Sequence, residues 1–128
     1  MPTREQMVTA VEAYVEAFAR EDVGSLLALF AEDAVVEDPV GSEPRQGRAQ
    51  YEPFFIGTVG SGAKVTLDGP IRTGPAYAAF AFHVDLMWEG QPMRIDVVDV
   101  FHFDAEGKIR HMQAFFGEAN FNPVNKDT

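Results

Sequence analysis

The sequence contains no cysteine, few basic residues and no long apolar run, and each absence excludes a class of protein. Without cysteine, the chain forms neither a disulfide framework nor a thiolate metal site. The sequence has ten Lys and Arg residues but 20 Asp and Glu residues. The resulting formal net charge of −10 argues against nucleic acid or anionic lipid as a partner. No segment approaches the ~18 consecutive apolar residues of a membrane-spanning helix.

Two further absences concern targeting and cofactors. The first residues, MPTREQ, lack the apolar stretch of a secretory signal. The sequence has no Gly-rich phosphate loop and no cluster of metal ligands, so we expect neither a metal nor an organic cofactor. These features predict a cytoplasmic protein with a neutral or weakly acidic small-molecule ligand. The length of 128 residues fits one domain, residues 1–128, which can bury roughly two thirds of its unfolded surface.

The N-terminal third of the chain predicts helices. Thr3 and Gln6 have the spacing of a capping box, in which each side chain bonds the backbone of the other residue. From there, apolar residues recur at spacings of three and four, as they do on one face of a helix. The sequence therefore predicts a helix over residues 3–20, with a buried stripe of Met7, Val11, Tyr14 and Phe18.

Alternating apolar and polar residues predict strands over most of the remaining chain. The short gaps between the last three strands indicate antiparallel hairpins. Helices first and strands last are typical of an α+β protein with N-terminal helices packed on an antiparallel sheet. We expect a short helix from Asp22 through Leu26, Leu27 and Phe30, a strand at 35–38, a helix at 48–56, a flexible link with Gly57, Gly60 and Gly62, and strands at 64–72, 77–88, 93–103 and 109–116.

The segment RIDVVDVFHF, residues 94–103, places one aspartate where an apolar residue is expected. Side chains alternate between the two faces of a strand, so Asp99 lies in phase with apolar residues such as Val97 and Phe101. A buried carboxylate needs a cation, water or its proton. The nearest cations, Arg94 and Lys108, lie on the opposite face or beyond a turn. Asp99 is then either tied to an amide or a water, or protonated, because desolvation raises a carboxyl pKa.

Tyr14 and Asp38 are two further polar residues whose positions in the predicted elements need an explanation. Tyr14 lies on the buried stripe of the first helix, where a hydroxyl needs a partner and often finds a backbone carbonyl. Asp38 ends a predicted strand and, on its own, is typical of a residue that orders the following loop. Taken together, Tyr14 and a protonated Asp99 are two uncharged donors for one oxyanion, and an ionised Asp38 is a base. Such a site abstracts a proton next to a carbonyl group.

Longer segments carry a resemblance to a known family. VEAYVEAF, LFAEDAVVEDPVGSEPR, WEGQP, DVVDVFHFD and MQAFFGEAN resemble, in the same order, segments of the bacterial 3-oxosteroid Δ5-isomerases, or ketosteroid isomerases. The resemblance spans nearly the whole chain. It implies a cone-shaped fold similar to nuclear transport factor 2, in which a curved antiparallel sheet and helices enclose an apolar cavity. It also implies a homodimer.

The same resemblance assigns roles to the three polar residues. Asp38 is expected to be the general base, and Tyr14 and Asp99 are expected to form the oxyanion hole. Protonated buried acids of this kind are a known pattern in that family. Family members also place a second tyrosine behind the catalytic one, whereas this chain has Phe55 and Phe30 at the corresponding positions. Tyr51, one helical turn before Phe55, is the remaining candidate for that hydrogen-bond relay.

The resulting expectation is a steroid isomerase that needs no cofactor. A 3-oxo-Δ5-steroid enters the cavity, Asp38 moves a proton from C4 to C6, and the dienolate oxygen binds to Tyr14 and Asp99. The histidines, His83, His102 and His111, are expected at the surface or in the dimer interface. The expected pocket wall consists of Phe54, Phe82, Val84, Leu86, Trp88, Val97, Phe101, Met112, Ala114 and Phe116.

Two alternatives stay open at this point. One is a related fold member that acts on another cyclic carbonyl compound, such as a polyketide cyclase. The other is a non-catalytic module for lipid binding or dimerisation. The three polar residues favour an enzyme, because a binding module gains little from a buried acid that costs several kcal/mol.

Overall fold

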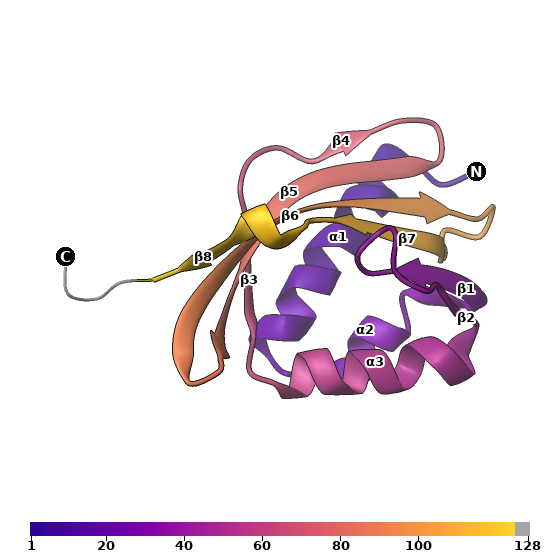
Figure 1. Ribbon diagram of the computed structural model, residues 1–128. Coiled ribbons are helices and arrows are strands. Elements are labelled where there is room, and N and C mark those ends of the chain that lie inside the picture. Colours follow the sequence, from indigo (N-terminus) through magenta and orange to yellow (C-terminus); the bar gives the residue numbers. More distant parts are fainter. Residues whose placement is uncertain (125–128) are drawn as a thin grey trace.

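The computed structural model describes residues 1–124 and shows three helices on one side of a curved sheet (Figure 1). The predicted α+β class is confirmed. Within the described residues, no helix is long and apolar enough to cross a membrane. The elements in chain order are α1 (Arg4–Ala19), α2 (Val23–Leu27), β1 (Phe30–Glu37), β2 (Arg45–Gln46), α3 (Arg48–Gly60), β3 (Lys64–Leu67), β4 (Arg72–Thr73), β5 (Tyr77–Trp88), β6 (Gln91–Phe103), β7 (Ile109–Phe115), a 3₁₀ turn at Glu118–Asn120, and β8 (Phe121–Pro123).

The sheet has the strand order β2-β1-β7-β6-β5-β3, with β4 paired to β5 and β8 paired to β6. Its centre is the long β5–β6 hairpin, whose register runs from Tyr77 opposite His102 to Trp88 opposite Gln91. All named pairs are antiparallel except that of β1 with β7, which run parallel. The sheet is therefore mixed, whereas the hairpin pattern of the sequence predicted antiparallel pairing throughout. Parallel strands are joined by long connections, so short loops between neighbouring strands do not predict which distant strands pair in parallel.

The local signals at the first two helices act as predicted. The Thr3 hydroxyl accepts a hydrogen bond from the Gln6 backbone N–H at 3.1 Å, and the Gln6 side chain accepts one from the Thr3 N–H at 2.8 Å. The Asp22 carboxylate accepts from the Ser25 N–H at 3.1 Å and thereby caps α2. These bonds satisfy amide groups that a helix N-terminus leaves without partners.

Two helix ends differ from the prediction. The second helix ends at Leu27, and Phe30 instead begins β1, where it pairs with Ile109 of β7. The third helix continues to Gly60 in spite of Pro53, its two glycines and the predicted end near residue 56. Val59 is buried beneath it, so tertiary packing outweighs the low helix propensity of glycine.

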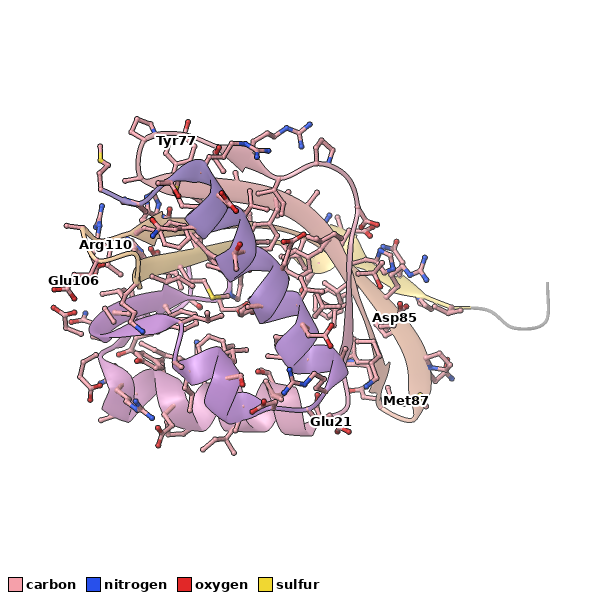
Figure 2. The ribbon with its side chains drawn as sticks, turned by 180° about the vertical axis from the view of Figure 1, so that it is seen from behind. Glu21, Tyr77, Asp85, Met87, Glu106 and Arg110 are labelled. Carbon is pink, nitrogen blue, oxygen red and sulfur yellow. The ribbon has the colours of Figure 1, made fainter. Side chains whose placement is uncertain are left out.

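The packed core and the open cavity lie at different ends of the sheet. Phe30, Tyr51, Phe55 and Phe101 are fully or almost fully buried where the helices meet the sheet. Their rings contact one another with centroid distances of 5.1 to 6.3 Å. In Figure 2, Glu106 and Arg110 mark one end of the molecule and Met87 marks the other, at the tip of the β5–β6 hairpin.

Candidate active site

A cavity of about 670 Å³ lies between the helices and the concave face of the sheet. Side chains of α1, α3, β5, β6 and β7 line it, and nearly all are apolar. The polar side chains in the lining are few: Tyr14, Asp38, Thr58, Ser61 and Asp99. An apolar cavity with a few convergent polar groups is typical of a small-molecule site.

Asp99 lies at the centre of this site and is fully buried. It occupies the middle of β6, opposite Phe80 of β5 and Ala114 of β7. Within residues 1–124, neither of its carboxyl oxygens has a hydrogen-bond partner. Burial, and secondarily the nearby Asp38, raises the pKa of Asp99 well above its ordinary value. Burial therefore favours the protonated form of Asp99, which offers a hydrogen-bond donor that no atom of residues 1–124 accepts.

Tyr14 lies beside Asp99, on the buried face of α1. Its ring packs edge-on against Phe101, two residues along β6 from Asp99, at a centroid distance of 5.2 Å. It also contacts Phe18 at 5.3 Å and Phe55 at 6.5 Å, so its surroundings are aromatic. Burial is the main cause that raises the pKa of Tyr14, and the Asp99 and Asp38 carboxyls add to it. Tyr14 is thus a neutral donor.

Tyr51 does not supply the hydrogen-bond relay that the family resemblance left open. Its hydroxyl donates to the backbone carbonyl of Ala31 at 3.0 Å. Between Tyr51 and Tyr14 lies Phe55, which contacts both rings. The Tyr14 ring therefore has apolar support, and its packing against neighbouring rings positions its hydroxyl group.

Asp38 follows the last residue of β1, and its side chain reaches the cavity while staying half-buried. The loop after it is anchored by a hydrogen bond of 2.8 Å from the Val40 N–H to the Ala114 carbonyl. Because Ala114 pairs with Asp99, this bond brings the Asp38 loop alongside Asp99. Burial raises the pKa of Asp38 to about 6, and the positive charge of Arg45 opposes that rise. Burial thus raises the pKa of both aspartates, and with a pKa of about 6 Asp38 is still largely ionised at neutral pH.

The cavity wall largely follows the inward faces of the strands. Phe101 is the exception among the expected wall residues, because it packs behind Tyr14 in the core and does not line the cavity. The structure places the other expected residues along the cavity: Phe54, Phe82, Val84, Leu86, Trp88, Val97, Met112, Ala114 and Phe116.

Several lining residues had not been expected. Gly57, Thr58 and Ser61 belong to the last turns of α3 and the residue after it, and the prediction had ended this helix too early. These residues could have been predicted only if the sequence pattern had indicated that the helix continues beyond residue 56. The remaining unexpected residues are Phe18, Pro53, Ala63, Val65, Ile95 and Phe121.

The histidines lie away from the cavity and bond to polar neighbours. His83 contacts Asp68 at 2.8 Å, and His102 contacts Gln113 at 2.8 Å. His111 contacts Glu37 at 2.5 Å, on the strand pair β1–β7. Within residues 1–124, no group of three or more acidic or histidine side chains has the arrangement of a metal site.

Arg45 is a functional candidate that sequence reasoning missed. It lies on β2, opposite Val36 of β1, and its guanidinium carbon lies 3.9 Å from the centre of the Phe54 ring. Phe54 lines the cavity. The only signal in the sequence is an arginine in the loop that follows the candidate base, and arginines in loops are common.

Comparison with known proteins agrees with this geometry. The SnoaL-like domain matches residues 11–112. The chain belongs to the SnoaL-like family. A steroid Delta-isomerase of Nocardioides simplex is 38% identical over 112 residues, which is 87% of this chain and 89% of the relative. The resemblance to steroid isomerases is confirmed, and with it the expected class of enzyme, an isomerase.

A solved structure supports the fold. The chain resembles SalBIII, described as an epoxide hydrolase/cyclase-like enzyme with a role in pyran ring formation in the polyether salinomycin. The TM-score is 0.90 with 27% sequence identity, and the match covers 97% of this chain and 100% of that chain. The predicted cone-like fold, similar to nuclear transport factor 2, is confirmed.

The protonation of Asp99 has a consequence for stability that can be measured. Below its ordinary pKa of 3.8, Asp99 is protonated in both the folded and the unfolded chain. At higher pH the unfolded chain ionises and the folded chain does not, so the wild type loses up to about 1.4 kcal/mol of stability per pH unit. Asp99→Leu should remove this loss and be at least as stable at pH 7. Urea unfolding of both proteins from pH 4 to pH 8 measures it.

A matched control uses Asp96, which lies on the same strand but on the exposed face. Asp96→Leu removes a carboxylate that already contacts Asn122 and the solvent. Its stability relative to the wild type should change little with pH. Parallel pH dependences for the wild type and Asp99→Leu would show that Asp99 ionises normally in the folded protein.

Proposed function

We propose that the chain converts 3-oxo-Δ5-steroids into their conjugated 3-oxo-Δ4 isomers. The observation that carries this proposal is the fully buried Asp99, whose oxygens have no partner within residues 1–124 and which lies beside Tyr14 and the Asp38 loop. Two neutral donors at the end of an apolar cavity are suited to a ketone that becomes an oxyanion. The steroid Delta-isomerase relative supports the choice of substrate.

The reaction needs one base and one oxyanion site. Asp38, with a pKa of about 6, is largely ionised at neutral pH and removes the proton from C4. The electrons move to the ketone oxygen, which accepts hydrogen bonds from Tyr14 and Asp99. Protonated Asp38 then returns the proton at C6, and the double bond is conjugated with the ketone. A base with a pKa close to neutrality is suited to both steps, because it must accept and release the same proton.

Ultraviolet absorbance tests the proposal directly. The product is a conjugated enone and absorbs where the Δ5 substrate does not. Mixing the protein with a Δ5-3-ketosteroid should therefore raise the absorbance far faster than buffer alone. A chain without isomerase activity toward steroids would leave the absorbance at the rate of buffer.

A second candidate is a cyclase, favoured by the structural likeness to SalBIII. The same groups fit that chemistry. Asp38 can take the proton of a hydroxyl group as its oxygen bonds to an epoxide carbon, the epoxide C–O bond breaks, and Asp99 can donate a proton to the released oxygen. Incubation with a hydroxy-epoxide and detection of the cyclic ether by mass spectrometry tests it. Formation of the ether without any steroid isomerisation would replace the first proposal.

Binding of product-like ligands gives a prediction that does not depend on turnover. A planar phenolic steroid presents an acidic hydroxyl where the dienolate oxygen forms, whereas a saturated neutral steroid presents none. We expect the phenol to bind at least tenfold more tightly, because the site is complementary to an oxyanion. Isothermal titration with two steroids of equal size measures this difference. Equal affinity would indicate a carrier of apolar molecules.

The remaining expectations from the family resemblance are also proposals. We expect a homodimer, which sedimentation of the purified protein checks. We also expect the protein in the cytoplasm, where a fluorescent fusion would locate it.

A further inference from the structure

We propose that Arg45 is a positioning residue that keeps the base Asp38 ionised, through a positive charge held in place by Phe54. This inference rests on the proposed function only in that Asp38 acts as the base. It concerns a residue on the edge strand β2 that is not among the residues lining the cavity.

The position of Arg45 follows from strand pairing. β2 pairs with β1 so that Arg45 lies opposite Val36, two residues before Asp38. Its guanidinium carbon lies 3.9 Å above the Phe54 ring, a distance typical of a cation–π contact. Phe54 and Asp38 line the same cavity. The aromatic contact thus holds a cation against a residue of the cavity that Asp38 also lines.

Arg45 has an unusual lack of charged partners. Its Nη1 atom is buried and, within residues 1–124, has no hydrogen-bond partner. The described part of the chain also shows no ion pair for Arg45 within 4.0 Å, although acidic residues outnumber basic ones. Arg48, three residues later, binds Glu52 at 2.8 Å and Glu32 at 3.8 Å. Among residues 1–124, no carboxylate in contact with Arg45 neutralises its positive charge.

The charged and titratable groups around Asp38 leave Arg45 a clear role. From β6, Asp38 faces Asp99, and from α1 it faces Tyr14; burial raises the pKa of both groups and so favours their neutral forms. From β2 it faces Arg45, whose charge lowers the pKa of Asp38, while burial raises it. Neither neutral group opposes the effect of burial, so Arg45 is the group that favours the carboxylate. Without it, burial would leave more Asp38 protonated and inactive as a base.

The test is the pH profile of kcat/KM for Arg45→Met with a Δ5-3-ketosteroid. We expect the acidic limb of the profile to move upward by about 0.5 to 1 pH unit, as for one charge at a distance beyond contact. At pH 6 the full unit corresponds to about a fivefold loss of activity, whereas at pH 9 the variant should match or exceed the wild type. A structural role alone would lower activity at every pH.

Two variants serve as controls. Arg45→Lys keeps the charge and should leave the limb within about 0.2 units of the wild type. Arg48→Met removes an equal charge from the same region, but from a residue already paired with Glu52, and should leave the limb in place. If Arg45→Lys and Arg45→Met shift the limb equally, or if Arg48→Met shifts it as much as Arg45→Met, the proposal is wrong.

A second readout does not require turnover. Carbon NMR of labelled carboxyl groups follows the titration of Asp38 in the free protein, with Asp38→Asn used to assign the signal. The midpoint should rise in Arg45→Met, and in Arg45→Gln if the methionine variant does not fold. An unchanged midpoint overturns the role of Arg45. A shifted midpoint in a protein that isomerises no steroid supports the role of Arg45 and leaves only the proposed function in error.

Discussion

Asp38→Asn should reduce turnover of a Δ5-3-ketosteroid by about 10²–10⁴-fold or more, the largest effect expected of any single substitution. General base catalysis accounts for a loss of that size, and here the same carboxyl group also returns the proton. The amide has nearly the shape of the carboxyl group but cannot accept the proton from C4. Ultraviolet absorbance assays at pH 8, where wild-type Asp38 is ionised, measure the loss of turnover.

Binding and a neighbouring carboxylate supply the controls for this variant. Asp38→Asn should still bind a phenolic steroid, because Tyr14 and Asp99 are intact. Glu37→Gln changes the adjacent residue, which contacts His111 away from the cavity, and should keep nearly full activity. If Asp38→Asn retains more than a tenth of the wild-type rate, another group is the base.

The second large effect is expected from Asp99→Ala, which deletes one oxyanion donor. Loss of one such donor typically costs about 2.7–4 kcal/mol in the transition state, or about 10²–10³-fold in kcat. Asp99→Asn keeps an N–H donor at the same place and should lose less. The ordering wild type, Asn, Ala in kcat is the expected result. It requires Asp99 to act as a donor, which an ionised carboxylate cannot do.

Two measurements separate this role from a structural one. Asp96→Ala removes an aspartate from the exposed face of the same strand and should be nearly fully active. A carboxyl-carbon NMR titration should show no ionisation of Asp99 near its ordinary value of 3.8. A normal titration, or equal activity of the Asn and Ala variants, would show that Asp99 does not donate to an oxyanion.

The sequence predicted best what depends on neighbouring residues. Strand alternation alone placed Asp99 on the inner face among apolar side chains, and the structure shows it fully buried there. The Thr3–Gln6 capping box placed the start of α1 correctly, and with it Tyr14 on the buried face of that helix. Periodicity and capping depend on residues that are close together in the sequence, so both can be predicted without knowledge of the tertiary structure.

What the sequence failed to predict depends on tertiary contacts. The parallel pair β1–β7 joins distant segments, and burial of Val59 carries α3 past two glycines to Gly60. Phe101 has the same phase as Val97 but packs behind Tyr14, because α1 covers that end of the strand. Arg45 was missed since its relation to Asp38 requires the pairing of β2 with β1. Periodicity carries no information on which elements meet.

The parallel pairing of β1 with β7 also determines when the site can form during folding. Glu37, beside the base, contacts His111, which lies 74 positions later in the chain. Because β7 follows β1 in the chain, the hydrogen bond from Val40 to Ala114 that anchors the Asp38 loop cannot form until β7 has been synthesised. Such long-range pairing forms slowly, because the chain loses the entropy of closing a long loop before any contact between the two strands stabilises it. We therefore expect Asp38 to reach its place beside Asp99 late in folding.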